Sequence, residues 1–294
     1  SGKYGDFTNE SLLLASLVLD VFIEECSNKP LFNPKIVVKI DNTSVINEYS
    51  KVVLLKAHQL ALDSGIPYFA SLNCKEGGAL TFSSSGIKFM LDLSGDWETD
   101  TLRTGCLGGV TINLPRIAIE SNKDKNVFID LLKERFELSA RALGIKNNVL
   151  KKFGKNSLPF LMQKANGDTY FRLENCSRIV NLAGFREAVE TFTGKSLNSE
   201  EGRSFAENII SDLLSFKQKL GRKYGKRLYP ALLSTIEASE RLAQLDIERY
   251  GVAKVKFSGT RDKPYYSVVK RIDLEPAQPL FAPTAALEQM QLLK

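Results

Sequence analysis

The sequence has a single histidine, His58, among its 294 residues. A Ser-His-Asp triad or a multi-histidine metal site would have to be built around that one side chain. His58 lies in the segment LLKAHQLALDSGIP (54–67), in which apolar residues recur at the spacing of an amphipathic helix. The pattern therefore favours a structural or surface histidine over a catalytic one.

Long apolar runs are also missing. The apolar stretch 12–23 is interrupted by Ser16 and Asp20 and falls short of the about 20 residues that a membrane-spanning helix needs. No basic region precedes this stretch, so it predicts a core helix and not a signal peptide. We expect a cytoplasmic protein that does not enter a membrane.

Cysteines are few and scattered. The sequence contains Cys26, Cys74, Cys106 and Cys176. Because no two of them form a CxxC pair, their spacing argues against a zinc site and against a disulfide framework. The distribution is typical of a reducing, cytoplasmic setting, and we expect no bound metal.

The excess of positive charge is small. A net charge of +6 and a pI near 9.0 favour anionic partners such as nucleotides, but they are low for a dedicated nucleic-acid-binding protein of this length. The segment KQKLGRKYGKR (217–227) concentrates cations, which attract phosphates without sequence preference. The same string is typical of a solvated helix end. Nucleic-acid binding is therefore the least favoured function.

Apolar periodicity divides the chain into alternating helices and strands. Helices are expected over about 10–25, 46–63, 126–144, 181–194, 203–220 and 237–249. Strands are expected at 34–40, 67–72 and 87–93, within 106–120, and as a strand or hairpin near 253–271. This alternation predicts an α/β architecture, and the absence of a long linker predicts one domain over 1–294.

One stretch, CLGGVTINLPRIAIE (106–120), reads as a buried strand that stops abruptly at Asn113, Pro115 and Arg116. Its part GGVTINLPRIAIE resembles a segment of the anaerobic (class III) ribonucleoside-triphosphate reductases, which are glycyl radical enzymes. Further segments resemble that family in the same order: LFNPKIVVKI, GIPYFASL, LLKERFELSARALG, NLAGFREAVETFTG, LSTIEASERLAQLDIERYG and DKPYYSV. The resemblance touches almost the whole chain and implies the ten-stranded α/β barrel of that family, complete or in part.

In that family the strand ends and loops at one rim of the barrel hold the nucleotide, so the resemblance places Asn113 and Arg116 at a nucleotide pocket. The segment STIEAS (234–239) supplies hydroxyls at what reads as a helix N-terminus, where free N–H groups and the positive dipole end suit phosphate. The resemblance implies that this loop binds the phosphates of the substrate, through the following residues: Ser234, Thr235, Glu237, Ala238 and Ser239. The simpler interpretations are a strand ended by a proline turn and an ordinary helix cap with Glu237 in its first turn.

The resemblance is incomplete where radical chemistry is concerned. The family needs a cysteine thiyl radical, and a gapless match puts Gly86 and Ile87 where relatives carry that cysteine. Cys74, earlier in the same loop, is the candidate radical carrier, and Cys106 is expected to line the pocket. The remaining cysteines, Cys26 and Cys176, are expected to be buried structural thiols.

The segments that flank the barrel in relatives are also not found. The last residues, FAPTAALEQMQLLK (281–294), contain no glycine and no cysteine, so the glycyl radical and the cysteine-rich zinc segment expected beyond PYY are missing. No N-terminal ATP cone is expected either. The given chain is therefore predicted to lack the stored radical.

Three functions follow. The first is a reductase barrel that binds ribonucleoside triphosphate and becomes active only with a separate radical domain and an activase that uses S-adenosylmethionine and an iron–sulfur cluster. The second is a non-catalytic nucleotide-binding or interaction protein on the same barrel, and the third is a nucleic-acid-binding protein. The sequence leaves open whether the chain is an enzyme. The resemblance also implies a homodimer, with the apolar stripe of 205–220 or the helix 126–143 as its contact, unless these faces wrap the barrel itself.

Overall fold

The computed structural model describes residues 7–29, 31, 33–40, 47–71, 81–82, 88–165, 167–233 and 235–267. The chain divides into two compact units, residues 1–91 (unit 1) and 92–294 (unit 2). Within the part of the chain that the structure describes, no helix is long and apolar enough to cross a membrane.

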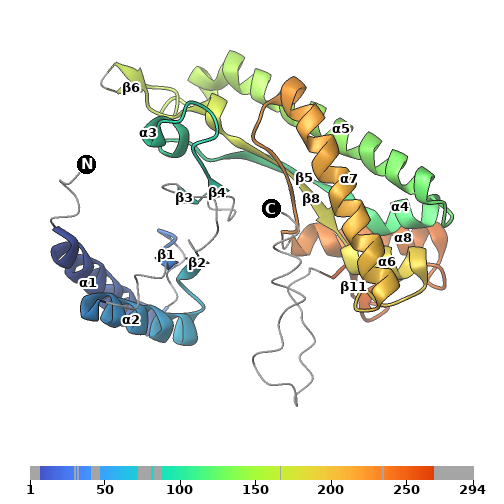
Figure 1. The fold of residues 1–294 in the computed structure, drawn as a ribbon, viewed down its shortest axis with the longest axis horizontal. Coiled ribbons are helices and arrows are strands. Elements are labelled where there is room, and N and C mark those ends of the chain that lie inside the picture. Colours follow the sequence, from blue (N-terminus) through green and yellow to red (C-terminus); the bar gives the residue numbers. More distant parts are fainter. Residues whose placement is uncertain are drawn as a thin grey trace. The chain divides into compact units, whose positions relative to one another are not determined.

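Unit 1 combines helices with short strands. Its elements are α1 (Thr8–Cys26), β1 (Val37–Ile40), α2 (Glu48–Ser64), β2 (Tyr68–Ser71), β3 (Thr81–Phe82) and β4 (Lys88–Phe89). The two helices lie side by side (Figure 1), and β1 pairs in parallel with β2. Helix α2 begins where Asn47 accepts a hydrogen bond from the Tyr49 amide at 2.8 Å, and it ends at Gly65, whose φ is +71°.

Unit 2 contains the larger sheet and the longer helices. Its helical elements are α3 (Trp97–Thr101), α4 (Leu114–Glu120), α5 (Lys125–Ser157), the 3₁₀ turn η2 (Leu173–Asn175), α6 (Phe185–Thr193), α7 (Glu200–Tyr224) and α8 (Ile236–Tyr250). Its strands are β5 (Cys106–Asn113), β6 (Lys164–Ala165), β7 (Asp168–Thr169), β8 (Ser177–Ala183), β9 (Leu228–Ala231), β10 (Ser258–Gly259) and β11 (Pro264–Tyr265).

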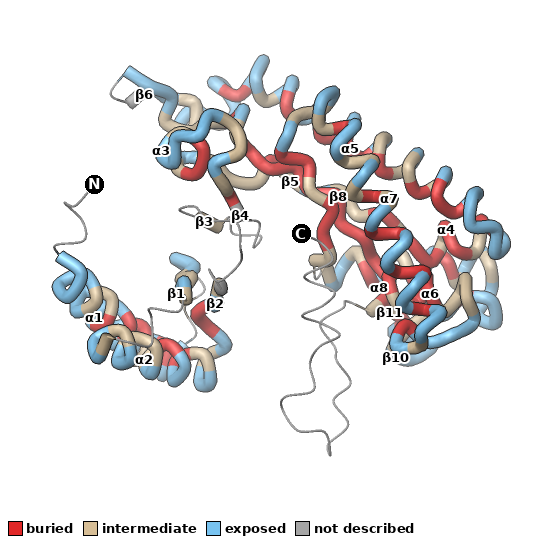
Figure 2. Tube along the Cα trace, viewed as in Figure 1, coloured by how far each residue is buried: buried red, intermediate tan, exposed pale blue. Residues whose placement is uncertain are grey.

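Three parallel strands form the sheet of unit 2 in the order β5–β8–β9, with β8 in the centre. All seven residues of β8 are buried, and Figure 2 shows this strand buried along its whole length. Because both faces of β8 are covered, its sequence SRIVNLA shows no strict alternation of apolar and polar residues. The described strands form open sheets, which accords with a barrel that is present only in part.

The two faces of this sheet differ in chemistry. One face contributes Val180, Leu182 and Ile112 to a large apolar core, over which α5 and α7 run alongside each other (Figure 1). On the opposite face Asn181 of β8 lies beside Thr111 of β5, its partner in the strand register. Successive residues of a strand point to opposite faces, so the polar row is kept apart from the core.

The apolar stripes expected on the helices are used inside unit 2. Phe205, Ile209 and Leu213 of α7 are buried in the core, as are Phe128 and Leu132 of α5. The apolar stripes thus pack against the sheet of unit 2, which was the alternative to their use as a dimer contact. A homodimer remains a prediction.

Three expectations about the elements were wrong. Helix α5 does not stop at Gly144 but continues to Ser157. Residues 181–183 belong to β8, so the helix expected from 181 begins only at Phe185. The alternating segment 87–93 forms strand only at β4, and β9 was not anticipated. Pro230 lies within β9, and a proline argues against a strand unless the strand is at an edge, as β9 is in the described sheet.

Candidate functional site

The abrupt end of β5 is a direct change from strand to helix. Asn113 is the last residue of β5 and also caps α4, because its Oδ1 accepts a hydrogen bond from the Arg116 amide at 3.1 Å. Pro115 stands in the first turn of α4, where its missing N–H costs nothing. The cap also aims the Nδ2 of Asn113 at Asp246, 2.7 Å away.

Asp246 of α8 lies at the centre of a buried polar group that we call the Asp246 cluster: Asn113, Arg116, Asp246 and Tyr266. The Asp246 side chain is fully buried and accepts hydrogen bonds from Arg116 Nε at 2.6 Å and from the Tyr266 hydroxyl. Arg116 Nη2 lies 2.6 Å from the same carboxylate. Burial, and then the hydrogen bond to Asp246, raise the pKa of Tyr266 far above its usual value, so the phenol stays a donor.

A second buried carboxylate, Glu187 of α6, binds the residues near Tyr266 in the C-terminal part of unit 2. Glu187 accepts hydrogen bonds from the Ser258 hydroxyl at 3.0 Å and from the Ser267 amide at 2.9 Å. Gly184, with φ +69°, lies so close to Pro115 and Tyr266 that a Cβ atom would stand 2.5 Å from a ring carbon of Pro115. The segment that contains β10 and β11 is thereby fixed against the end of β5.

Asn181 ties the start of α8 to the sheet. Its Oδ1 accepts a hydrogen bond from the Leu233 amide at 2.6 Å, and its Nδ2 lies 3.2 Å from the Leu233 carbonyl. The same Nδ2 is 3.2 Å from the Thr235 hydroxyl and 3.5 Å from the Thr111 hydroxyl. The structure therefore brings Thr235 next to the last residues of β5 and β8. This is the carboxyl edge of the parallel strands, where α/β proteins commonly bind ligands.

The other residues expected in the phosphate loop follow on the first turn of α8. Glu237 is exposed, Ala238 is half-buried and Ser239 is buried. The carbonyl of Ser239 accepts a hydrogen bond from the Tyr266 amide at 3.3 Å, which joins this turn to the Asp246 cluster. Ser234 lies outside the described residues.

The expected cysteines are not brought to this edge. Cys106 begins β5, seven residues before Asn113, and at about 3.3 Å per strand residue the two lie roughly 23 Å apart. Cys74 lies outside the described residues. Cys26 and Cys176 are buried, as expected, and burial raises the pKa of the Cys176 thiol.

Three of the six cations in the basic segment 217–227 have partners within unit 2. Arg227 is buried, with its guanidinium 2.6 Å from the Asp92 carboxylate, and Lys223 lies 2.9 Å from Glu137. The Lys217 ammonium sits 4.7 Å from the centre of the Tyr229 ring, and burial lowers its pKa. Lys219, Arg222 and Lys226 are exposed, so part of the segment keeps an exposed cationic surface.

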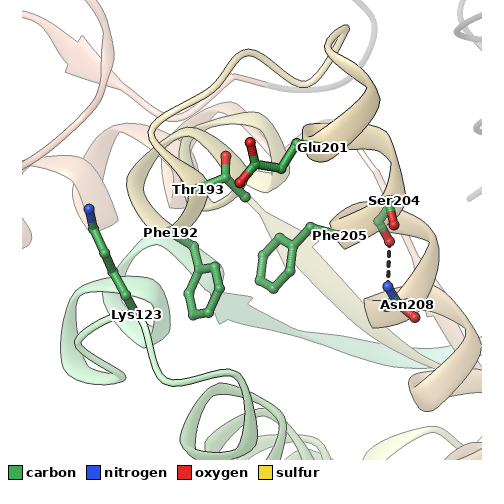
Figure 3. A pocket seen from close by; sticks show the side chains of 7 residues that line it. All are labelled: Lys123, Phe192, Thr193, Glu201, Ser204, Phe205 and Asn208. Carbon is green, nitrogen blue, oxygen red and sulfur yellow. Dashed lines mark hydrogen bonds between the residues drawn. The ribbon is translucent and has the colours of Figure 1, made fainter.

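A shallow pocket of ≈ 470 Å³ lies elsewhere in unit 2, between the end of α6 and the first turns of α7 (Figure 3). Its floor is the stacked pair Phe192 and Phe205, whose ring centres are 4.2 Å apart. Lys123 and Glu201 stand at its border (Figure 3). None of the residues expected in the nucleotide site lines this pocket.

The sequence did contain signals for the residues that were missed. The buried positions of α8 are Ser239, Ala243 and Asp246, so the aspartate occupies a core-facing position of the helix. Asn181 likewise interrupts an apolar run in β8. A polar side chain at a buried position needs specific partners, and such positions mark buried networks.

Comparison with known proteins identifies the family. The family model described as anaerobic ribonucleoside-triphosphate reductase matches residues 1–289. The anaerobic ribonucleoside-triphosphate reductase of Salmonella typhimurium is 28% identical over 185 residues, which are 58% of this chain and 25% of the relative. That of Enterobacteria phage T4 is 27% identical over 264 residues, 84% of this chain and 42% of the relative. The chain spans less than half the length of these curated relatives.

Solved structures agree on the fold. The anaerobic ribonucleotide reductase from Thermotoga maritima in complex with dATP and CTP matches with a TM-score of 0.65 and 18% identity, over 85% of this chain and 41% of that chain. The same enzyme with glycerol in the active site gives a TM-score of 0.65 over 84% of this chain and 40% of that chain. The expected α/β fold class is confirmed. Since the family model covers nearly all of the sequence, the chain belongs to the anaerobic ribonucleoside-triphosphate reductase family.

Proposed function

We propose that this chain supplies the nucleotide-binding part of a reductase barrel and holds a ribonucleoside triphosphate at the carboxyl edge of β5 and β8. The observation that carries the proposal is the link through Asn181, which keeps Thr235 and the start of α8 beside Thr111. The first-turn amides of a helix, together with its dipole, form a favourable site for phosphate. One α/β barrel domain over 1–294 would include this edge.

The roles of the individual residues follow from which of their polar atoms already have hydrogen-bond partners. Asp246 engages Nε and Nη2 of Arg116, and Nη1 has no partner among the described residues, so Arg116 is proposed to contact the substrate through Nη1. Both ends of the Asn113 carboxamide are used, which gives Asn113 the role of shaping the pocket wall. The phosphate loop is proposed to comprise Ser234, Thr235, Glu237, Ala238 and Ser239.

Reduction of the bound nucleotide is proposed to need parts beyond the described residues. A glycyl radical, generated by an activase that uses S-adenosylmethionine and an iron–sulfur cluster, would supply the thiyl that removes the ribose hydrogen. Cys74 is the proposed thiyl carrier in this chain, whereas Cys106, at the start of β5, is given no role at this edge. We further propose that the protein works as a homodimer in the cytoplasm.

Calorimetric titration of the 294-residue chain with CTP tests the proposal. We expect saturable CTP binding that stabilises the chain against heat, and about tenfold weaker binding by Arg116→Ala. Lys152→Ala, which removes one cation from the exposed face of α5, is the matched control and should bind as the wild type does. Absence of CTP binding by the wild type would overturn the proposed function. Binding without deoxynucleotide formation, even with a radical domain and activase added, would favour the non-catalytic alternative.

A further inference from the structure

The carboxamide of Asn181 is buried in the middle of the sheet. Most of its hydrogen bonds are made with the loop that leads into α8. Only 2% of the residue is exposed, so the amide cannot be satisfied by water and its partners must come from the protein. Those partners are the backbone N–H and C=O of Leu233 and the hydroxyls of Thr235 and Thr111. Asn181 thus pairs with Leu233 much as a backbone peptide group would.

These bonds have a consequence for α8. Thr235 is the residue that precedes α8, and threonine in this position ordinarily accepts a hydrogen bond from an amide of the first helical turn. Thr235 makes no such bond, and its hydroxyl oxygen lies instead against the Nδ2 of Asn181. The helices that begin after Asn47, Asp96, Asn113, Asp124 and Ser199 all have side-chain caps. Thr235 is therefore a residue type that can cap α8, but its hydroxyl is held where it makes no capping hydrogen bond.

The amides of the first turn of α8 are left open as a result. The first N–H groups of a helix have no partner within the helix, and a capping side chain competes with any ligand for them. The amides of Ile236, Glu237 and Ala238 have no acceptor among the described residues. Among the described residues, a phosphate that binds there displaces no protein group.

We propose that Asn181 is a positioning residue for nucleotide binding: it holds the Thr235 hydroxyl away from the first turn of α8 and so keeps these amides available to the substrate's phosphates. The inference rests on the proposed function, because it concerns the same site. It adds a residue that does not touch the substrate and acts through Thr235.

Asparagine suits this role because it offers a donor and an acceptor in one planar group. The acceptor Oδ1 fixes the Leu233 amide, and the donor Nδ2 occupies the Thr235 oxygen. Alanine would remove both, and the freed Thr235 hydroxyl could then turn to cap the helix.

The test measures two ligands, CTP and the unphosphorylated nucleoside cytidine, against four forms of the full chain. These forms are the wild type, Asn181→Ala, Thr235→Val and the double variant. We expect N181A to bind CTP about five- to tenfold more weakly, the cost of displacing a helix cap, and to bind cytidine within about twofold of the wild type. T235V removes a hydroxyl of the proposed phosphate loop and sets the reference affinity of a loop without it. The double variant should bind CTP within about twofold of T235V, because valine cannot cap the helix.

A matched control removes a buried polar side chain far from α8. Asp100 of unit 2 accepts its hydrogen bonds from residues 93–95, so Asp100→Asn should leave both affinities unchanged at a temperature where the variant is folded. If N181A loses affinity for CTP and cytidine alike, or for neither, Asn181 serves only the fold and the inference is wrong. It is equally wrong if the loss of Asn181 weakens CTP binding as much in the T235V background as in the wild type. If the wild type itself does not bind CTP, the proposed function is wrong. That result differs from the outcomes that contradict only the role of Asn181.

Discussion

Unit 1 and unit 2 differ in how far their own residues cover their apolar surfaces. Among the described residues, the main core of unit 2 contains 23 buried residues and the core of unit 1 six: Leu19, Phe22, Cys26, Ala57, Leu60 and Ile66. Helix α1 also exposes a second apolar face, with Leu13, Leu14 and Leu17 each more than half exposed. Helices that are apolar all round are ordinarily covered on both sides. The comparison teaches that unit 2 is the more self-sufficient of the two, and four predictions test it.

The largest effect is expected at the Asp246 cluster. Asp246→Ala would leave the Arg116 guanidinium and the Tyr266 hydroxyl without their partner, which should lower the free energy of unfolding of unit 2 by about 3–5 kcal/mol. The single tryptophan, Trp97, lies in unit 2, so its fluorescence during urea titration reports on this unit. Asp246→Asn, which keeps the shape, should lose less. Equal losses in the two variants would show that the charge is unimportant.

The next largest effect is expected at Phe128 in the main core. This ring is fully buried and meets Phe192 and Phe205 edge-on, with centres 5.5 and 5.4 Å away. Phe128→Ala should cost about 3–4 kcal/mol, because little can move to fill the cavity. The Trp97 transition should shift to lower urea concentration. A shift no larger than that of an exposed substitution would contradict the packing described for unit 2.

A smaller effect is expected in unit 1. Leu60 is buried in the small core between α1 and α2, and Leu60→Ala should cost about 2–3 kcal/mol, since a core with few neighbours relaxes more easily. Far-ultraviolet circular dichroism should show early loss of helix while the Trp97 transition stays in place. If L60A moved the Trp97 transition as far as F128A does, the two units would unfold together and the comparison would fail.

The smallest effect concerns pH. Burial alone would raise the pKa of Asp100, but hydrogen bonds from Ser94, Leu93 and Gly95 outweigh it and hold the pKa below its usual value. Stability from a lowered pKa is present above the unfolded value of about 4 and is lost as pH falls through the folded value. Asp100→Asn should therefore cost about 1.5 kcal/mol at pH 7 and less at pH 3. An unchanged difference between wild type and variant at the two pH values would refute this.

The sequence predicted best the elements whose periodicity is strong. The stripe Phe205, Ile209, Leu213 and Leu220 is buried in the core, because a 3.6-residue repeat fixes which face of a helix is apolar. Strand β8 was missed because every one of its residues is buried, and an apolar run without alternation does not separate strand from helix. Strand β9 was not predicted, and it contains Pro230, a residue that is uncommon inside strands.

The candidate site could be anticipated only in its outline. The order of similar segments pointed to Asn113, Arg116 and the start of α8, and the chain does bring Thr235 close to the end of β5 through Asn181. Asp246, which joins Asn113 to Arg116, gave only the signal of a charge at a core-facing position. Which partner a buried charge meets depends on the path of the chain and not on its local sequence.

By itself the sequence determined the α/β class, the long amphipathic helices and the family, because these depend on spacing and on ordered local similarity. Only the tertiary structure decided that Asn113 meets Asp246, 133 residues later, and that Asn181 holds Thr235, 54 residues later. The physical reason is that such hydrogen bonds require the strand register and the helix packing to be in place first, since a donor and an acceptor interact only at short range and with the right orientation.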